Sequence, residues 1–169
     1  MSIRVEIERL ELEGKLFCLE STFSGLDTAR TAWVSQEVLE AISPPYRDRR
    51  GHRRYEFRQF LDGWLEYGLF SVTEDPDNKP EYAMLARVKP IEKELWDFRV
   101  TAPDAGIRAF GGFAELDTFV ILTWEYRDDI IDFNAEVERC MIEWRDMFGT
   151  VTPLKKVALN EYLSHFLAV

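Results

Sequence analysis

The chain is poor in the residues that build disulfide scaffolds and metal centres. Its 169 residues include two cysteines, Cys18 and Cys140, and two histidines, His52 and His165. The cysteines lie far apart and in no metal-ligand spacing, so we expect two free, buried thiols in a reducing compartment. The sequence therefore predicts neither a metal site nor a cofactor.

Long apolar runs are also missing. Charged residues at Arg4, Glu6 and Glu8 interrupt the apolar residues near the N-terminus, which argues against a secretory leader. No uninterrupted apolar stretch reaches the length needed to span a membrane. We therefore expect a cytoplasmic protein without a membrane partner.

Positive charge is the third shortage. The chain has 31 acidic and 21 basic residues and a net charge of -10, which disfavours an extended phosphate-binding surface. A local basic patch is still allowed, and residues 46–54 (YRDRRGHRR) are the only strongly basic run. This run reads either as an RNA- or phosphate-facing loop or as a solvated connector whose arginines pair with acids. We favour the connector, because no glycine-rich phosphate cradle accompanies the run.

Apolar and aromatic residues are abundant enough, at 46% and 14%, to fill the core of one domain. The chain centres on three short runs that alternate apolar and polar residues and are separated by turn-forming residues. These runs are ELWDFRV (94–100), GIRAFGGFAE (106–115) and TFVILTWEYR (118–127). Their hairpin-like spacing predicts an antiparallel meander.

The flanking segments predict further strands and four helices, which together give an α+β fold. Strands are expected at 3–9 and 16–20, paired as a hairpin around Gly14, and at 82–88. The expected helices are 28–42 (N-cap Ser24 or Asp27), 55–67 (ended by Gly68), 132–148 (N-cap Asp132, ended by Gly149) and 152–168. Pro103-Asp104-Ala105-Gly106 predicts a turn.

The expected C-terminal helix, 152–168, opens with Thr152 as N-cap and Pro153 at its first position. It is apolar on most sides, so it needs a partner surface. That surface is the sheet, another protein, or a second copy of the chain in a homodimer formed through this helix.

The order of the central motifs resembles the RelE/ParE superfamily of bacterial toxins, especially its HigB-like, phage-derived branch. The motifs are Glu94-Leu95-Trp96-Asp97-Phe98-Arg99-Val100, Ile107-Arg108-Ala109-Phe110, the strand Val120–Arg127 and the helical Ala135-Glu136-Val137-Glu138-Arg139. The resemblance covers roughly residues 55–145. It implies a small antiparallel sheet flanked by helices, with a RelE-like core at about 55–148, an N-terminal extension at 1–54 and the added C-terminal helix. The chain departs from the family in being longer and acidic, and in having Tyr126-Arg127 where the family has two lysines.

The resemblance implies the toxin of a toxin–antitoxin pair, a ribosome-dependent endoribonuclease that cuts mRNA. Such a reaction needs a proton acceptor, cations for the developing negative charge and an acid for the leaving oxygen. The implied site residues are Arg99, Arg108, Tyr126 and Arg127, and the implied partners are a cognate antitoxin and the ribosome with its mRNA. Strand alternation places Arg99 on an open sheet face, opposite Trp96, Phe98 and Val100.

The residues alone allow a structural role instead, in which Arg99 pairs with Asp97, and Arg108 with Glu115 or Glu125. Proton carriers are scarce, since only Lys93, Glu125 and Tyr126 lie near the motifs. Two further hypotheses therefore stand beside the nuclease. One is a non-catalytic RelE-like binding or regulatory protein of phage or plasmid origin, and the other is an unrelated α+β oligomer without a nucleic-acid role.

Overall fold

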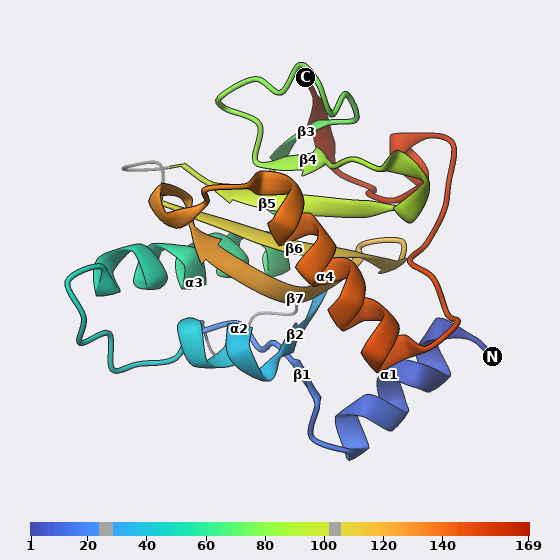
Figure 1. Ribbon diagram of the computed structural model, residues 1–169, viewed down its shortest axis with the longest axis horizontal. Helices are drawn as coiled ribbons and strands as arrows, with labels where there is room; N and C mark the ends of the chain where they lie inside the picture. Colours follow the sequence, from blue (N-terminus) through green and yellow to red (C-terminus); the bar gives the residue numbers. More distant parts are fainter. Residues whose placement is uncertain (24–28, 102–105) are drawn as a thin grey trace.

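The structure is a computed structural model that describes residues 1–23, 29–101 and 106–169. It is an α+β fold with a mixed, mostly antiparallel sheet in the strand order β1-β2-β7-β6-β5-β4-β3-β8, and helices cover both faces (Figure 1). The helices are α1 (Ile3–Leu12), α2 (Gln36–Ala41), α3 (Gly51–Leu65) and α4 (Phe133–Phe148). The strands are β1 (Leu16–Cys18), β2 (Thr31–Ser35), β3 (Phe70–Thr73), β4 (Leu85–Arg87), β5 (Leu95–Val100), β6 (Ile107–Glu115), β7 (Thr118–Tyr126) and β8 (Phe166–Ala168). Within the described ranges, no helix is both long and apolar enough to cross a membrane.

The predicted meander is confirmed as the centre of the sheet. Strand β5 pairs antiparallel with β6, and β6 pairs antiparallel with β7. Trp96, Phe98 and Val100 share the face that packs against α3, as their alternation predicts.

The opposite face of the meander is also covered, which corrects the expectation of an open face for Arg99. Every residue of β5 is buried. Helices α1 and α4 pack on this second face and form their own apolar cluster, which includes Leu95, Phe110, Val120 and Cys140. A sheet with helices on both faces buries both side-chain rows of its central strands.

The sheet is larger than a small meander, because segments from both ends of the chain extend it. Strands β1 and β2 join one side, where β2 runs parallel to β7. Strands β4, β3 and β8 join the other side, where β3 runs parallel to both β4 and β8. The region expected as an N-terminal extension thus supplies two strands of the common sheet.

The predicted N-terminal hairpin is wrong, because residues 3–12 form helix α1. Ile7 and Leu10 are buried whereas Val5 is exposed, so the buried positions follow helical spacing rather than alternation. Ser2 caps the helix by accepting a hydrogen bond from the Val5 amide. Strand β1 forms where expected, but its partner is β2.

The predicted helix over 28–42 is largely wrong. Residues 31–35 form strand β2, and only 36–41 are helical, as α2. Ser35 separates the two, because its hydroxyl accepts from the Val38 amide and donates to the Leu122 carbonyl of β7. The expected caps Ser24 and Asp27 lie outside the described residues, as do positions 103–105 of the expected turn.

The two longest predicted helices are confirmed. Helix α3 begins at Gly51, one turn earlier than expected, and ends at Leu65. Tyr67, not Gly68, takes the left-handed conformation after it, and the Gly68 amide bonds back to Gly63 in a Schellman arrangement. Helix α4 has Asp132 as its N-cap and stops at Gly149, as expected.

The predicted C-terminal helix is wrong. Residues 151–156 are neither helix nor strand, and the Leu154 amide donates to the Phe113 carbonyl of β6. Tyr162 and Leu163 enter the core on the α3 face, whereas Val157 is 93% exposed, so the buried positions do not form a helical stripe. The chain then ends in β8, an edge strand beside β3. The helix on which the homodimer expectation rested is therefore not present.

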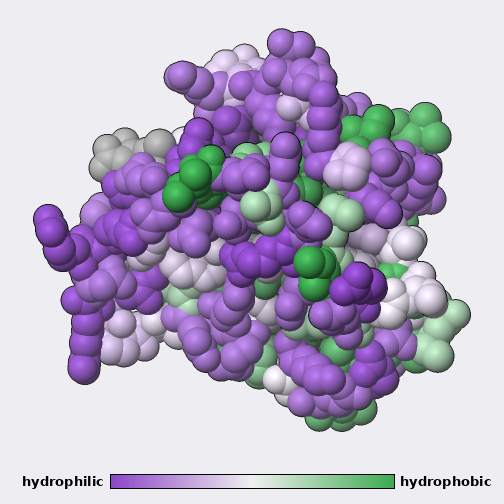
Figure 2. Space-filling model, viewed as in Figure 1, coloured by the Kyte–Doolittle hydropathy of each residue, from purple (hydrophilic) through white to green (hydrophobic). Residues whose placement is uncertain are grey.

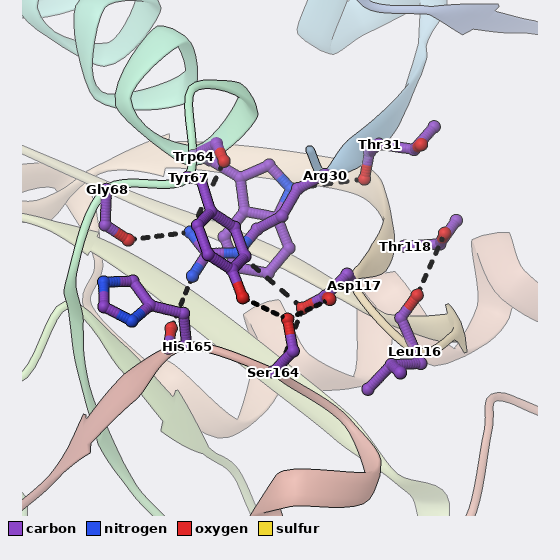
Figure 3. A network of polar contacts seen from close by, with 10 residues as sticks. All are labelled: Arg30, Thr31, Trp64, Tyr67, Gly68, Leu116, Asp117, Thr118, Ser164 and His165. Atoms are coloured by element: carbon purple, nitrogen blue, oxygen red, sulfur yellow. Dashed lines mark hydrogen bonds and ion pairs between the residues drawn. The ribbon is translucent and has the colours of Figure 1, made fainter. Parts of the chain in front are cut away.

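Arg30 fastens the C-terminal segment to the rest of the fold (Figure 3). Its fully buried guanidinium donates to the backbone carbonyls of Trp64, Gly68 and His165. It also lies 3.8 Å from the Asp117 carboxylate and over the Trp64 ring. One side chain thus joins the end of α3, the turn between β6 and β7, and the segment before β8.

Candidate functional site

The structure brings two of the four predicted site residues together. Arg99 on β5 and Arg108 on β6 are direct partners in the sheet register, so both point to the α4 face. Both are buried. Arg99 donates to the carbonyls of Pro80 and Ala83, in the segment before β4.

Two residues that the resemblance did not indicate complete this group. Asp97 lies on the same face of β5, 3.5 Å from Nε of Arg108 and 3.5 Å from Nζ of Lys79. Lys79 comes from the loop between β3 and β4, and its ammonium also lies 4.9 Å from the ring centroid of Phe133. We call Lys79, Asp97, Arg99 and Arg108 the buried cation cluster.

Burial controls the electrostatics of this cluster. Removal from water, together with the nearby charges of Arg99 and Arg127, lowers the pKa of Arg108 to about 10 against the attraction of Asp97. Burial also lowers the pKa of Lys79 and raises the pKa of Asp97. The carboxylate oxygens of Asp97 receive no hydrogen bond from any described residue.

The other two predicted residues lie elsewhere. Arg127 is exposed just after β7, at the edge of the buried cation cluster, where its charge reaches Arg108. Tyr126 points to the opposite, α3 face of the sheet, where the guanidinium of Arg50 stacks 3.7 Å from its ring centroid. The four residues therefore do not share one surface.

The candidate proton carriers do not approach the buried cation cluster in a catalytic arrangement. Glu125 is opposite Arg108 in the register, yet its carboxylate accepts from the Tyr126 amide and it is not among the charges that shift the pKa of Arg108. Burial raises the pKa of Tyr126, which keeps its phenol neutral. Lys93 lies beyond the other end of β5.

The basic run 46–54 is largely paired with acids. Arg50 and Arg53 form ion pairs with Asp129 and Asp128, and Arg54 pairs with Asp48. These contacts tie the start of α3 to the end of β7, which is the connector role that the sequence favoured.

A groove lies along the other end of α4. It has a volume of about 560 Å³, within the range of ligand-binding clefts. Its wall is formed by α4 from Glu138 to Arg145, the 3-10 turn Ile91–Lys93 and the segment after Gly149. Its apolar lining comes from Leu95, Met141, Ile142, Trp144, Val151 and Pro153. We call it the α4 groove.

A strained residue lines this groove. Glu94 is buried and has a positive φ of 56°, a conformation that non-glycine residues adopt rarely. Its carboxylate accepts from Arg87 and from the Tyr162 hydroxyl, each at 2.7 Å. Burial and this hydrogen bond raise the pKa of Tyr162 to about 12. The sequence does not indicate this group, because Tyr162 lies 68 residues from Glu94 and falls in the segment whose pattern predicts a helix.

Acidic side chains surround the exposed surface of α4. Glu138 lines the α4 groove, while Glu143 borders a second, smaller hollow together with Glu37 and Glu40 of α2. Burial and the neighbouring carboxylates of Glu37 and Asp146 raise the pKa of Glu143. Figure 2 shows this face as mostly hydrophilic, with small apolar areas between.

The remaining reactive groups form no assembled centre in the described parts of the chain. No group of three His, Cys, Asp or Glu side chains there is placed to hold a metal ion. Both cysteines are free, but Cys18 is exposed rather than buried, which corrects the expectation for that residue.

Comparison with known proteins gives no relative. No protein-family model, curated protein or solved structure matches this chain.

Proposed function

We propose that this chain is a non-catalytic binding protein that holds a segment of a basic partner protein in the α4 groove. The observation that carries the proposal is the groove itself, an open concave surface with an apolar lining beside α4, the longest helix in the described part of the chain. Ile142 stands at this surface with 43% of its area exposed. An amphipathic segment that covers Ile142 and Met141 would remove this apolar area from water.

The net charge of the whole chain, rather than the groove lining alone, selects the sign of the partner. Glu92 and Glu138 line it and form no ion pair with a described residue, and Glu143 and Asp146 lie farther around the same helix. Lys93, Arg145 and Lys155 also line the groove, so its lining is mixed in charge. The net charge of -10 decides the long-range attraction, which favours a basic partner and speeds the encounter.

The arrangement of the predicted nuclease residues favours binding over cleavage. Arg99 and Arg108 are buried, and Tyr126 lies on the opposite sheet face. A ribose hydroxyl and its phosphate would need cations and a proton acceptor on one accessible surface. The RelE-like endoribonuclease with its antitoxin and ribosomal partners thus stays a prediction from the resemblance.

A labelled amphipathic helical peptide of lysine and leucine tests the groove by fluorescence anisotropy. We expect it to bind the unmutated chain, and Ile142→Glu to weaken binding by about tenfold, because a buried charge replaces apolar contact. Ile131→Glu is the matched control, since Ile131 is a fully exposed isoleucine just before α4 and does not line the groove. We expect this control to bind like the unmutated chain.

Two results would overturn the proposal. An equal change in peptide binding in both glutamate variants would show that the position of the substitution does not matter and that the groove is not used. Growth arrest and mRNA cleavage on inducible expression, both abolished by Arg108→Ala, would show that the protein is a nuclease.

A further inference from the structure

The buried cation cluster contains more positive charge than its own carboxylate can neutralise. Lys79, Arg99 and Arg108 surround a single acid, Asp97. The side chain of Arg108 is 8% exposed and that of Asp97 is 1% exposed, so water screens these charges poorly. Buried charges normally occur in balanced, hydrogen-bonded pairs, because an unpaired one is costly.

Several hydrogen-bond donors in this cluster are not used. Arg108 makes one ion pair of 3.5 Å with Asp97 and one hydrogen bond of 3.4 Å with the Ile107 carbonyl, and has no other partner among the described residues. A guanidinium offers five N–H donors. Lys79 has only the 3.5 Å contact with Asp97 and the Phe133 ring. The geometry thus leaves donors of two cations free to bind a further acceptor.

The outer side of the cluster carries still more positive charge. The exposed Arg127 is close enough to lower the pKa of Arg108, and its charge also lowers the pKa of the adjacent Asp128, whose carboxylate pairs with Arg53. Glu125, the nearest acid in the sheet register, bonds to the Tyr126 amide instead. An anion that arrives at this edge would meet Arg127 first and then Lys79 and Arg108.

We propose that the buried cation cluster binds one compact oxyanion, a phosphate group that is either inorganic or the terminal group of a small phosphomonoester. Guanidinium and ammonium donors match phosphate oxygens well. The burial of Arg99 and Arg108 restricts the site to a single group and excludes the continuous backbone of a nucleic-acid strand. This site lies at the start of α4, so it is separate from the α4 groove and does not depend on the function proposed for it.

Thermal unfolding of the full chain with inorganic phosphate tests this site, with sodium chloride at equal ionic strength as the reference. A ligand that binds only the folded state raises the melting temperature, and the stabilisation grows with the logarithm of one plus the ratio of ligand concentration to Kd. We expect phosphate to raise the melting temperature and chloride not to. Lys79→Ala should weaken phosphate binding by about tenfold, as expected for the loss of one charged hydrogen bond.

Two variants separate binding from a merely structural role. Lys89→Ala is the matched control, because Lys89 is an exposed lysine that pairs with Asp77 outside the cluster, and it should keep the phosphate response. Arg108→Met removes one of the excess buried cations. We expect Arg108→Met to fold with at least the stability of the unmutated chain in chloride, and to lose the phosphate response.

Equal shifts by phosphate and chloride, or an unchanged phosphate response in Arg108→Met, would overturn the proposal. Unfolding of Arg108→Met together with a normal response in Lys79→Ala would also overturn it, because the cluster would then be a structural ion network. A short single-stranded RNA without a terminal phosphate should leave the melting temperature unchanged. A shift by this RNA equal to that of phosphate would contradict the restriction to a compact anion.

Discussion

Arg30 connects three segments that are far apart in the sequence, and it does so through backbone carbonyls (Figure 3). Lysine keeps the charge but has one donor centre, so Arg30→Lys should leave some of these buried carbonyls unpaired. We expect a loss of about 2 kcal/mol in the free energy of unfolding, measured by urea denaturation. Arg4→Lys is the matched control, because Arg4 forms an exposed pair with Glu115 and should change stability by less than about 0.5 kcal/mol. Equal losses in both variants would contradict this role.

The sequence could not indicate this role of Arg30. Its partners are carbonyl groups, which every residue carries, so no side-chain pattern marks them. Arg99 and Arg108 are different, because strand alternation allowed them to share a face if the strands paired in the right register, and the structure has that register. Alternation cannot reveal that a second layer covers the face, and this is why Arg99 was expected to be accessible.

At the scale of secondary-structure elements, the predictions are correct where contacts between neighbouring residues fix the element, and wrong where distant contacts fix it. The β5–β6–β7 meander and helices α3 and α4 are fixed by neighbouring residues, through short turns and caps that the sequence displays. The segments at both ends are fixed by distant partners instead. Residues 3–12 pack against the sheet and the end of α4, where Arg9 donates to the Met147 carbonyl. Apolar spacing alone allowed either a strand or a helix there.

The C-terminal segment offers a direct test of its observed path. Leu163 is fully buried in the core on the α3 face, while Leu167, on the edge strand β8, is 52% exposed. Leu163→Ala should therefore lower the free energy of unfolding by about 3 kcal/mol, through lost burial and a cavity. Leu167→Ala should change it by less than about 0.5 kcal/mol. Urea denaturation of both variants measures this difference. Comparable losses would instead indicate that β8 is buried, for example against a second copy of the chain.

At the scale of the whole molecule, α4 lies between the two proposed sites. Its first residue, Phe133, contacts Lys79 of the buried cation cluster, and its last two turns line the α4 groove. Strand β5 also contributes to both sites, with Leu95 at the α4 groove and Arg99 in the buried cation cluster. The molecule thus separates its charges, with excess cations beneath the start of α4 and excess acids around its exposed surface.

The excess of acids predicts how stability depends on pH. Burial and the carboxylates of Glu37 and Asp146 raise the pKa of Glu143 in the folded state. The folded protein therefore binds this proton more tightly than the unfolded chain. The contribution of Glu143 to the free energy of unfolding is thus most favourable at low pH and is lost as the pH rises through the folded pKa.

Two aspartates act in the opposite direction. Hydrogen bonds from Asn78 and Arg53 lower the pKa values of Asp75 and Asp128, so their contributions to the free energy of unfolding are lost as the pH falls through those values. We expect the melting temperature to rise as the pH falls from 7 toward the raised pKa of Glu143, and to drop below about pH 4, where free aspartate protonates. Glu143→Gln should be more stable than the unmutated chain at pH 7 and should show a smaller rise on acidification. An identical pH profile in this variant would show that the acids around α4 do not repel one another.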